Sequence, residues 1–257
     1  MRQDWFDELG ELLRIPSVSA DPAHSDDVVR AAEWVADKIR RSGGEAELQP
    51  YGERPLVVGE IRASSNADSA PTILCYGHFD VQPPAPLDLW ESDPFEATIR
   101  DEWLYARGGA DDKGQLWMLL HAAGELAAAG ALPINIRVVS DGEEEVGGQS
   151  IVKFLAEDER GADACVIFDG GMEARDLPAL SIATRGLAAF NIRVSTGQRD
   201  LHSGMYGNAA MNAIHALTET LGGILPRDGR VPEALRVGIT PVTGEERAGW
   251  EQQPAGA

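Results

Sequence analysis

Residues 72–83 read Thr-Ile-Leu-Cys-Tyr-Gly-His-Phe-Asp-Val-Gln-Pro, a sequence typical of an α/β sheet with a ligand site. Its first half, residues 72–76, is a short apolar run bounded by turn residues, which is typical of a strand buried in a sheet. The run leads into His78 and Asp80, whose side chains point the same way because they are two residues apart. Ligands of open α/β sheets bind beyond the carboxyl ends of the strands. The stretch therefore predicts a buried strand with a site at its end.

Helix and strand patterns alternate on both sides of this stretch. Apolar residues recur at helical spacing in several segments, and we expect Ser25 to cap one of the helices. The expected helices cover residues 3–14, 26–41, 114–129 and 150–158. The expected strands cover residues 45–49, 56–61, 72–76, 134–140 and 164–168, with a hairpin over residues 97–106. This alternation predicts the α/β class, with a sheet sandwiched by helices.

The pattern changes in the last third of the chain. Residues 187–195 alternate between apolar and polar side chains as a strand does, and a helix is expected over residues 208–222. Residues 243–257 are polar and end without a closing element. We therefore expect one domain over residues 1–183 and the incomplete beginning of a second, smaller domain over residues 184–257.

The composition excludes several classes of partner. The 257 residues include 22 Lys and Arg against 42 Asp and Glu, which gives a formal charge of −20. Such a surface repels nucleic-acid phosphates and anionic membranes, so neither is an expected partner. No apolar run approaches the roughly 20 residues that span a bilayer. The N-terminus lacks the pattern of a signal peptide, so we expect a cytoplasmic protein.

The cysteine content excludes a disulfide scaffold. The chain has two cysteines, Cys75 and Cys165, which is too few to staple a domain of this length. Both lie in apolar runs with strand character, where a cysteine usually behaves as a small buried apolar side chain. We therefore expect two buried free thiols.

Acidic and imidazole side chains recur at four places just beyond predicted strands. The candidates are His78 with Asp80, Asp111 with Asp112, Glu143–Glu145, and Asp169. Each group alone has a plainer interpretation, because carboxylates at the start of a helix cap it and runs of glutamate are usually solvated. Together they offer the nitrogen and oxygen ligands of a divalent cation, zinc above all. Two cations would also relieve the repulsion among neighbouring carboxylates.

Three motifs occur in a characteristic order along the chain. They are Gly-His-Phe-Asp-Val-Gln-Pro at residues 77–83, Arg-Gly-Gly-Ala-Asp-Asp-Lys-Gly at 107–114 and Glu-Glu-Val-Gly-Gly at 144–148. In this order they resemble the motifs of the co-catalytic zinc exopeptidases, peptidase family M20. That family includes carnosine-type dipeptidases, glutamate carboxypeptidases, aminoacylases and succinyl-diaminopimelate desuccinylases. The resemblance extends from Ile-Pro-Ser-Val-Ser at residues 15–19 to Asp-Leu-His-Ser-Gly-Met-Tyr-Gly at residues 200–207.

The resemblance implies a zinc-exopeptidase-like mixed sheet sandwiched by helices. Residues 1–183 would be the N-terminal part of a zinc-dependent catalytic domain, and residues 184–257 the beginning of a smaller α+β lid and dimerisation domain. Residues 89–95 and 200–207 are most similar to the dipeptidase branch of the family. The implied activity is hydrolysis of the amide bond of dipeptides or small N-acyl amino acids by metal-bound hydroxide. The implied assembly is a homodimer joined through the lid.

The resemblance also implies a role for each motif residue. The implied ligands of two zinc ions are His78, Asp111, Glu145 and Asp169, with Asp111 as the bridge and Co²⁺ or Mn²⁺ as alternative metals. The implied catalytic residues are Asp80, which orients His78, Glu144, which is the general base, and the lid residue His202. In the family, the histidine that His202 matches reaches the site of a partner subunit and stabilises the oxyanion.

One ligand of the family has no counterpart in this chain. In the family a distal histidine near the end of a longer chain completes the Glu145 zinc site. Here His215, the only histidine after His202, lies inside a helix pattern. We therefore expect the N-terminal part of such an enzyme, with the remainder of the catalytic domain missing. The alternative is an inactive truncated fragment that acts at most as a dimerising non-enzyme. A two-metal phosphoesterase is disfavoured, because the cluster has a single histidine and the chain lacks a basic phosphate clamp.

Overall fold

The computed structural model describes residues 2–52, 54–172, 174, 177–181, 184, 186–187, 189–226, 230 and 232–251. The chain divides into two compact units, Met1–Pro178 and Ala179–Ala257. Residue 183, at which the sequence predicts a domain boundary, lies outside the described residues. The assignment of a catalytic domain and a lid domain stays a prediction.

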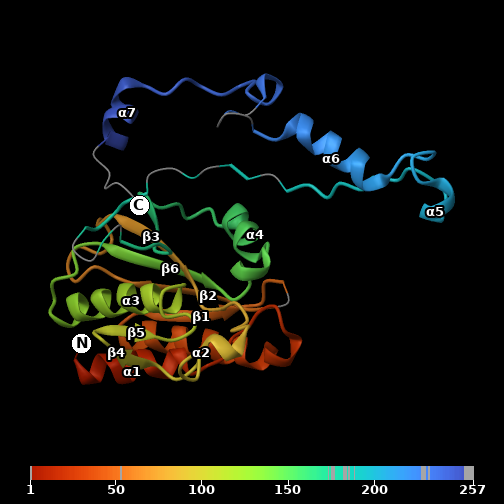
Figure 1. Cartoon of the computed structure of the whole chain (residues 1–257). Helices are drawn as coiled ribbons and strands as arrows, with labels where there is room; N and C mark the ends of the chain where they lie inside the picture. The colour runs from red at the N-terminus through yellow and green to blue at the C-terminus, as the bar shows by residue number, and fades with distance from the viewer. Residues whose placement is uncertain are drawn as a thin grey trace. The chain divides into compact units, whose positions relative to one another are not determined.

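A five-stranded mixed sheet forms the centre of the first unit (Figure 1). Its strands in spatial order are β1 (Glu45–Gln49), β2 (Leu56–Ile61), β6 (Asn135–Asp141), β3 (Thr72–His78) and β7 (Ala164–Ile167). Strands β6 and β7 run parallel to β3, whereas β2 is antiparallel to its neighbours β1 and β6. The predicted mixed sheet is therefore confirmed, and β3 extends two residues further than predicted, to His78.

Helices cover both faces of this sheet (Figure 1). They are α1 (Gln3–Leu13), α2 (Ser25–Arg41), α3 (Lys113–Ala128) and α4 (Ser150–Glu157). Successive side chains of a strand point to opposite faces of the sheet. On one face, Val57 of β2 and Val138 of β6 pack in a buried cluster with α2 and α3. Their neighbours Val58 and Val139 pack on the opposite face with Phe154 of α4. The predicted sandwich of helices around the sheet is confirmed.

Smaller elements complete the first unit, and one of them corrects a prediction. A hairpin of β4 (Thr98–Arg100) and β5 (Trp103–Tyr105) forms where the sequence predicts it. The 3-10 turns are η1 (Pro22–His24), η2 (Leu87–Leu89) and η3 (Glu144–Val146). Ser25 does not cap α2, because η1 runs directly into the helix and the Ser25 hydroxyl donates to the carbonyl of Pro22.

The edge strand β7 is exposed along its length. Cys165 lies on this strand and is exposed, whereas Cys75 on the central strand β3 is buried. The prediction of two buried thiols is therefore wrong for Cys165. An apolar run identifies a strand, but the place of that strand in the sheet decides whether its side chains are covered.

The second unit is helical in its described residues. Its elements are α5 (Ser203–Tyr206), α6 (Ala213–Ile224), the 3-10 turn η4 (Glu233–Leu235) and α7 (Gly244–Glu251). Helix α6 begins later than predicted because the side chain of Asn212 accepts a hydrogen bond from the backbone of Ile214 and caps it. The strand predicted over residues 187–195 is not formed by residues 187 and 189–195, which pair with no described strand. None of the described helices combines the length and the apolar character that crossing a bilayer requires.

Candidate metal centre

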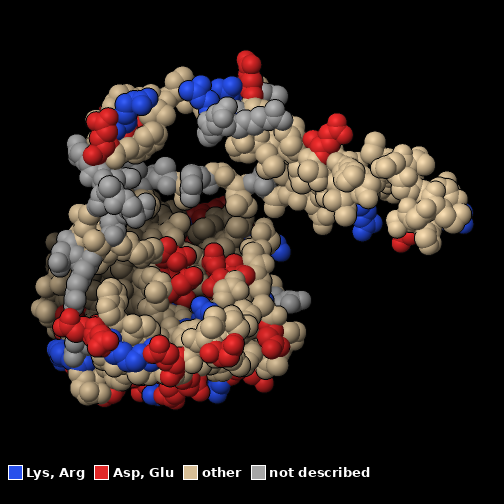
Figure 2. Space-filling model, in the orientation of Figure 1, with Lys and Arg blue, Asp and Glu red and all other residues tan. Residues whose placement is uncertain are grey.

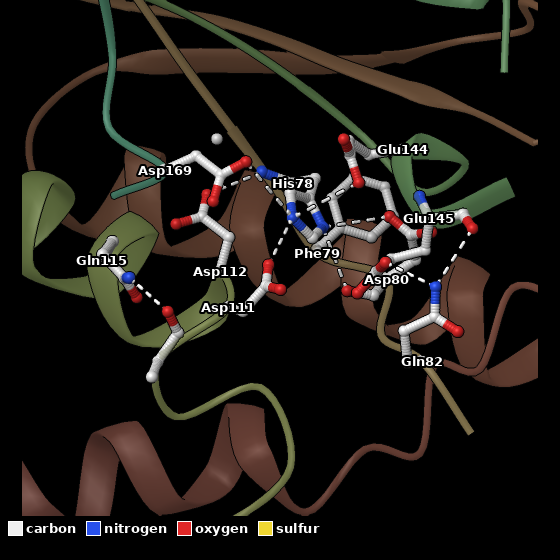
Figure 3. Close-up of polar contacts among 12 residues, drawn as sticks. His78, Phe79, Asp80, Gln82, Asp111, Asp112, Gln115, Glu144, Glu145 and Asp169 are labelled. Carbon is white, nitrogen blue, oxygen red and sulfur yellow. Dashed lines mark hydrogen bonds and ion pairs between the residues drawn. The ribbon is translucent and has the colours of Figure 1, made fainter. Parts of the chain in front are cut away.

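The carboxyl ends of β3, β6 and β7 lie at one edge of the sheet, because these strands are parallel. His78 is the last residue of β3, and Asp169 follows β7 by two residues. Asp111 follows the predicted hairpin, as expected, and not a strand of this sheet. It lies in the turn between the β4–β5 hairpin and α3. Figure 3 shows that this turn brings Asp111 to the same edge, beside His78.

The side chains of His78, Asp111 and Asp169 converge there. Nε2 of His78 lies 3.0 Å from Oδ1 of Asp111 and 3.8 Å from Oδ2 of Asp169. One ligand atom of each residue lies within 4.8 Å of the others, and no further group of this kind occurs in the part of the chain that is described. The side chain of His78 is 0% exposed and that of Asp111 is 60% exposed. The cluster is therefore buried on the histidine side and open on the other.

The contacts of His78 leave Nε2 facing the carboxylates. Nδ1 donates to the backbone carbonyl of Asp80 at 3.1 Å and lies 3.2 Å from Oδ1 of the same residue. Nδ1 therefore carries a proton. Nε2 faces the carboxylates of Asp111 and Asp169, and it directs a lone pair at them unless it is itself protonated or bound to a metal ion. Burial opposes a charged imidazole, yet the Asp80 contact and the surrounding carboxylates raise the pKa of His78 to about 10. This position therefore stabilises positive charge.

Asp112 adds a buried carboxylate behind the cluster. Its Oδ2 accepts a hydrogen bond from the backbone N–H of His78 at 3.0 Å. Its Oδ1 has no hydrogen-bond partner among the described residues, and burial raises the pKa of Asp112 to about 8. Glycine is required at position 77, because a Cβ there would lie 2.6 Å from Oδ2 of Asp112. The unpartnered oxygen and the crowding of carboxylates fit a centre that holds a divalent cation.

Glu143 and Glu144 are adjacent but lie in different environments. Glu143 is buried, and its Oε1 accepts a hydrogen bond from the backbone N–H of Ser150 at 2.7 Å, at the start of α4. The side chain of Glu144 is 43% exposed, and its Oε2 lies 3.9 Å from Nε2 of His78. Partial burial raises the pKa of Glu144. The charge of His78 acts to lower this pKa, but the nearby carboxylates raise it further, and the net shift is upward. Glu143 therefore supports the fold, and Glu144 faces the cluster.

Glu145 lies outside the three-residue cluster and is held by two other residues. Its Oε2 accepts a hydrogen bond from the side-chain amide of Gln82 at 2.7 Å, and its backbone N–H donates to Oδ2 of Asp80 at 3.1 Å. The side chain of Asp80 is fully buried and also contacts His78 through Oδ1. One carboxylate thus joins the histidine to the turn that bears Glu144 and Glu145 (Figure 3).

Gln115 is a site residue that the sequence analysis missed. It is buried in the first turn of α3, and its side-chain amide donates to the carbonyls of Ala110 and Gly170. Ala110 precedes Asp111 and Gly170 follows Asp169, so one side chain ties together the two loops that carry the carboxylates. A polar residue among the buried apolar positions of a helix was the available signal in the sequence.

Residues 74–248 match the model of a known family, Peptidase family M20/M25/M40. The chain belongs to this family. Membership confirms the resemblance that the motifs indicated, and it implies a metal cofactor, for which the three residues of the cluster offer ligand atoms. In this M20 chain the matched region includes the three residues of the cluster as well as Glu144 and Glu145.

Relatives of known activity align over nearly the whole chain. It is 33% identical over 258 residues to the cysteinylglycine-S-conjugate dipeptidase of Corynebacterium striatum and 28% identical over 271 residues to the beta-Ala-His dipeptidase of Rattus norvegicus. Each alignment covers 98% of the chain and 54% of the relative. The crystal structure of an M20 family metallo-carboxypeptidase from Sulfolobus solfataricus, Sso-CP2, matches with a TM-score of 0.76 at 26% identity, over 96% of the chain and 56% of that protein. The chain therefore spans about half the length of the curated relatives it matches.

The acidic character of the M20 chain is visible on its surface. On the face drawn in Figure 2, Asp and Glu side chains gather in a hollow of the first unit. The exposed carboxylate residues of the site itself include Asp111, Asp169 and Glu144. Such a concentration of negative charge attracts cations and repels anions such as phosphate.

His202 belongs to the second unit and is exposed there. Its Nδ1 accepts a hydrogen bond from the backbone N–H of Gly204 at 3.0 Å, at the start of α5. In the neutral ring the proton is then on Nε2, which can donate. His215 lies in α6 and is exposed, as the helix pattern in the sequence indicated. The role of His202 toward a partner subunit stays a prediction.

Proposed function

We propose that the chain carries the zinc site of a metallopeptidase that hydrolyses the amide bond of dipeptides or small N-acyl amino acids. The observation that supports this most strongly is the convergence of His78, Asp111 and Asp169 beside Glu144. Two relatives are named as dipeptidases, which favours dipeptides as the substrate class. On this proposal residues 1–183 belong to the catalytic domain, and residues 184–257 begin a lid through which the protein dimerises.

The residues of the site provide ligands for zinc. His78, Asp111 and Asp169 would hold one ion, and Asp111 with Glu145 would contribute to a second. One imidazole nitrogen and several carboxylate oxygens form a set that Zn²⁺ accepts and that Co²⁺ or Mn²⁺ also accept. When bound, the ions supply Lewis acidity, which polarises the scissile carbonyl and acidifies water.

Glu144 is the residue that would move protons. Its carboxylate is half-exposed and borders the cluster, so both water and substrate can reach it. The pKa of Glu144 is raised, which suits a group that must first accept a proton from water and then donate it to the leaving amine. Asp80 would act through His78, because its contact with Nδ1 keeps Nε2 turned toward the cluster.

His202 would stabilise the oxyanion of a partner subunit in the homodimer. The support from this chain is that Nδ1 is engaged by Gly204, which leaves the Nε2 proton for donation. A hydrogen-bond donor beside the substrate carbonyl oxygen stabilises that oxygen mainly in the transition state, when negative charge develops on it. Loss of His202 should therefore lower turnover more than it weakens substrate binding.

Zinc binding tests the proposal. After dialysis against zinc-supplemented buffer, elemental analysis should find about one tightly held ion per chain, because one complete set of three ligands is present. Asp169→Asn should lose this ion, whereas Asp88→Asn, which alters an exposed carboxylate of η2, should keep it. A folded chain without zinc would contradict the proposal, and so would zinc that Asp169→Asn leaves unchanged.

A further inference from the structure

The segment of residues 15–19, Ile-Pro-Ser-Val-Ser, lies against the turn that follows His78. Ser17 is 0% exposed, and its hydroxyl donates to the backbone carbonyl of Phe79 at 2.6 Å. In return the backbone N–H of Val81 donates to the carbonyl of Ser17 at 3.0 Å. Val18 and Val81 form an isolated parallel bridge beside these bonds. Ser17 therefore holds the turn at two points, one on each side of Asp80.

The carbonyl that Ser17 holds belongs to the peptide unit from which Asp80 departs. The orientation of this peptide plane sets the direction of the Asp80 backbone and side chain. Both parts of Asp80 contact Nδ1 of His78, the carbonyl at 3.1 Å and Oδ1 at 3.2 Å. A change at the Phe79 carbonyl would thus reach the imidazole through a single residue.

The same segment is anchored at its other end by Lys113. This side chain is fully buried, and its Nζ donates to the carbonyls of Ile15 at 2.6 Å and Leu12 at 3.1 Å. Lys113 follows Asp111 by two residues at the start of α3. The segment therefore connects the turn that follows His78 with the loop that bears Asp111.

We propose that Ser17 is a positioning residue for the metal centre, which it serves by holding the Phe79 carbonyl and, through Asp80, the ring of His78. This inference rests on the proposed function, because it assumes that the cluster of His78, Asp111 and Asp169 binds zinc. Hydrogen-bond partners beyond the ligands themselves commonly change metal affinity by about 10-fold to 100-fold when they are removed. Since Ser17 acts through one intervening residue, we expect the lower end of that range.

Ser19 provides a matched control within the same segment. It is also buried, but its hydroxyl has no hydrogen-bond partner among the described residues. Ser17→Ala and Ser19→Ala each remove a buried hydroxyl oxygen. Of the two, Ser17→Ala is the variant that loses a hydrogen bond to the Phe79 carbonyl. Val58→Ala serves as a second control, because it weakens the core on the α4 face of the sheet.

The experiment measures the dissociation constant of Zn²⁺, the visible absorption of bound Co²⁺ and the Tm of the metal-free protein. Ser17→Ala should weaken Zn²⁺ binding about 10-fold and change the Co²⁺ spectrum, since that spectrum depends on ligand geometry. Ser19→Ala should match the wild type in both metal readouts, and Val58→Ala should lower Tm without changing either. Ser17→Cys, whose thiol is a weak donor of similar size, should give an intermediate affinity for Zn²⁺. It replaces Ser17→Ala in the experiment if Ser17→Ala does not fold.

Two outcomes would overturn the inference. If the Ser17 variants lower Tm as Val58→Ala does but keep the wild-type affinity for Zn²⁺, Ser17 supports the fold alone and the proposed function stands. If the folded wild type binds no Zn²⁺, the proposed function fails, and the positioning role fails with it.

Discussion

Two turns that meet at the edge of the sheet are built in opposite ways. The end of β3 and the turn after it carry His78 and Asp80, whose side chains are 0% exposed, and this turn is hydrogen-bonded to Ser17. The turn after β6 contains η3 and leaves the side chain of Glu144 43% exposed. The two turns touch where the backbone of Glu145 donates to Asp80.

The difference separates a fixed part of the site from an adaptable part. A histidine that buried contacts already orient loses little conformational freedom when a cation binds, which favours affinity. An exposed glutamate keeps the rotamer freedom that proton transfer between water and a leaving amine requires. We therefore expect changes in the buried turn to affect metal binding and changes in the exposed turn to affect turnover.

The largest expected effect is on the exposed turn. Glu144→Gln in an active form of the protein should lower kcat for dipeptide hydrolysis by about 100-fold or more, because the amide cannot accept a proton. Zinc content should stay near the wild-type value. Glu143→Gln is the matched control: it keeps the oxygen that accepts from Ser150 and should leave kcat within about 2-fold. If Glu143→Gln lowered kcat by about 100-fold and Glu144→Gln left it within about 2-fold, Glu143 would be the residue that moves protons.

The next largest effect concerns the link between the carboxylate loops. Gln115→Leu removes the amide that donates to Ala110 and Gly170, so Asp111 and Asp169 lose a shared support. Zinc affinity should fall by about 10-fold in a binding titration. Gln149→Leu, which alters an exposed glutamine before α4, should bind zinc as the wild type does. Equal affinities in the two variants would show that Gln115 does not support the cluster.

A smaller effect is expected at Gln82. Gln82→Leu removes the amide that donates to Glu145, which lies outside the three-residue cluster. The first zinc ion should therefore bind within about 3-fold of the wild-type affinity, since its three ligands keep their contacts. A loss as large as that of Gln115→Leu would place Glu145 among the ligands of the first ion.

The smallest effect at the site should come from a remote ion pair. Nζ of Lys38 on α2 lies 2.7 Å from Oε2 of Glu8 on α1. Burial acts to raise the pKa of Glu8, but the hydrogen bonds from Lys38 and Trp117 outweigh it, and the pKa is lowered. The pair therefore stabilises the fold above the unfolded-state pKa of about 4.3, and this stabilisation is lost as the pH falls through the lower folded-state value.

Lys38→Met checks this expectation. It should reduce the free energy of unfolding by about 1–2 kcal/mol at pH 7 and flatten the dependence of stability on pH in the acidic range. Denaturant unfolding at several pH values measures this. Zinc affinity at pH 7 should not change, and a change of more than about 2-fold would mean that the α1–α2 contact is coupled to the metal centre.

The sequence predicted the position of the site better than the contacts that support it. The apolar run before His78 identified β3, and the resemblance to the family indicated Asp111 and Asp169 as candidate metal ligands. The partners of Ser17 and Gln115 could not be predicted, because each lies against residues far away in the chain. A local pattern carries no information about which distant carbonyl a buried hydroxyl or amide will meet.

The same limit explains the errors. The exposure of Cys165 depends on β7 being an edge strand, and the apolar pattern of a strand does not reveal its neighbours. Among the three glutamates after β6, Glu143 is the buried one, and it accepts a hydrogen bond from the backbone N–H of Ser150 at the start of α4. Spacing alone did not distinguish it from Glu144 and Glu145, whereas the resemblance to the family assigned roles to those two residues and none to Glu143.

Anomalous X-ray scattering from crystals grown with zinc would locate the ion and test directly whether His78, Asp111 and Asp169 bind it. We predict one strong peak about 2.0–2.2 Å from Nε2 of His78 and from carboxylate oxygens of Asp111 and Asp169. A weaker second peak near Glu145 would be consistent with it. A strong peak at other residues, with the space beside Nε2 of His78 empty, would contradict it.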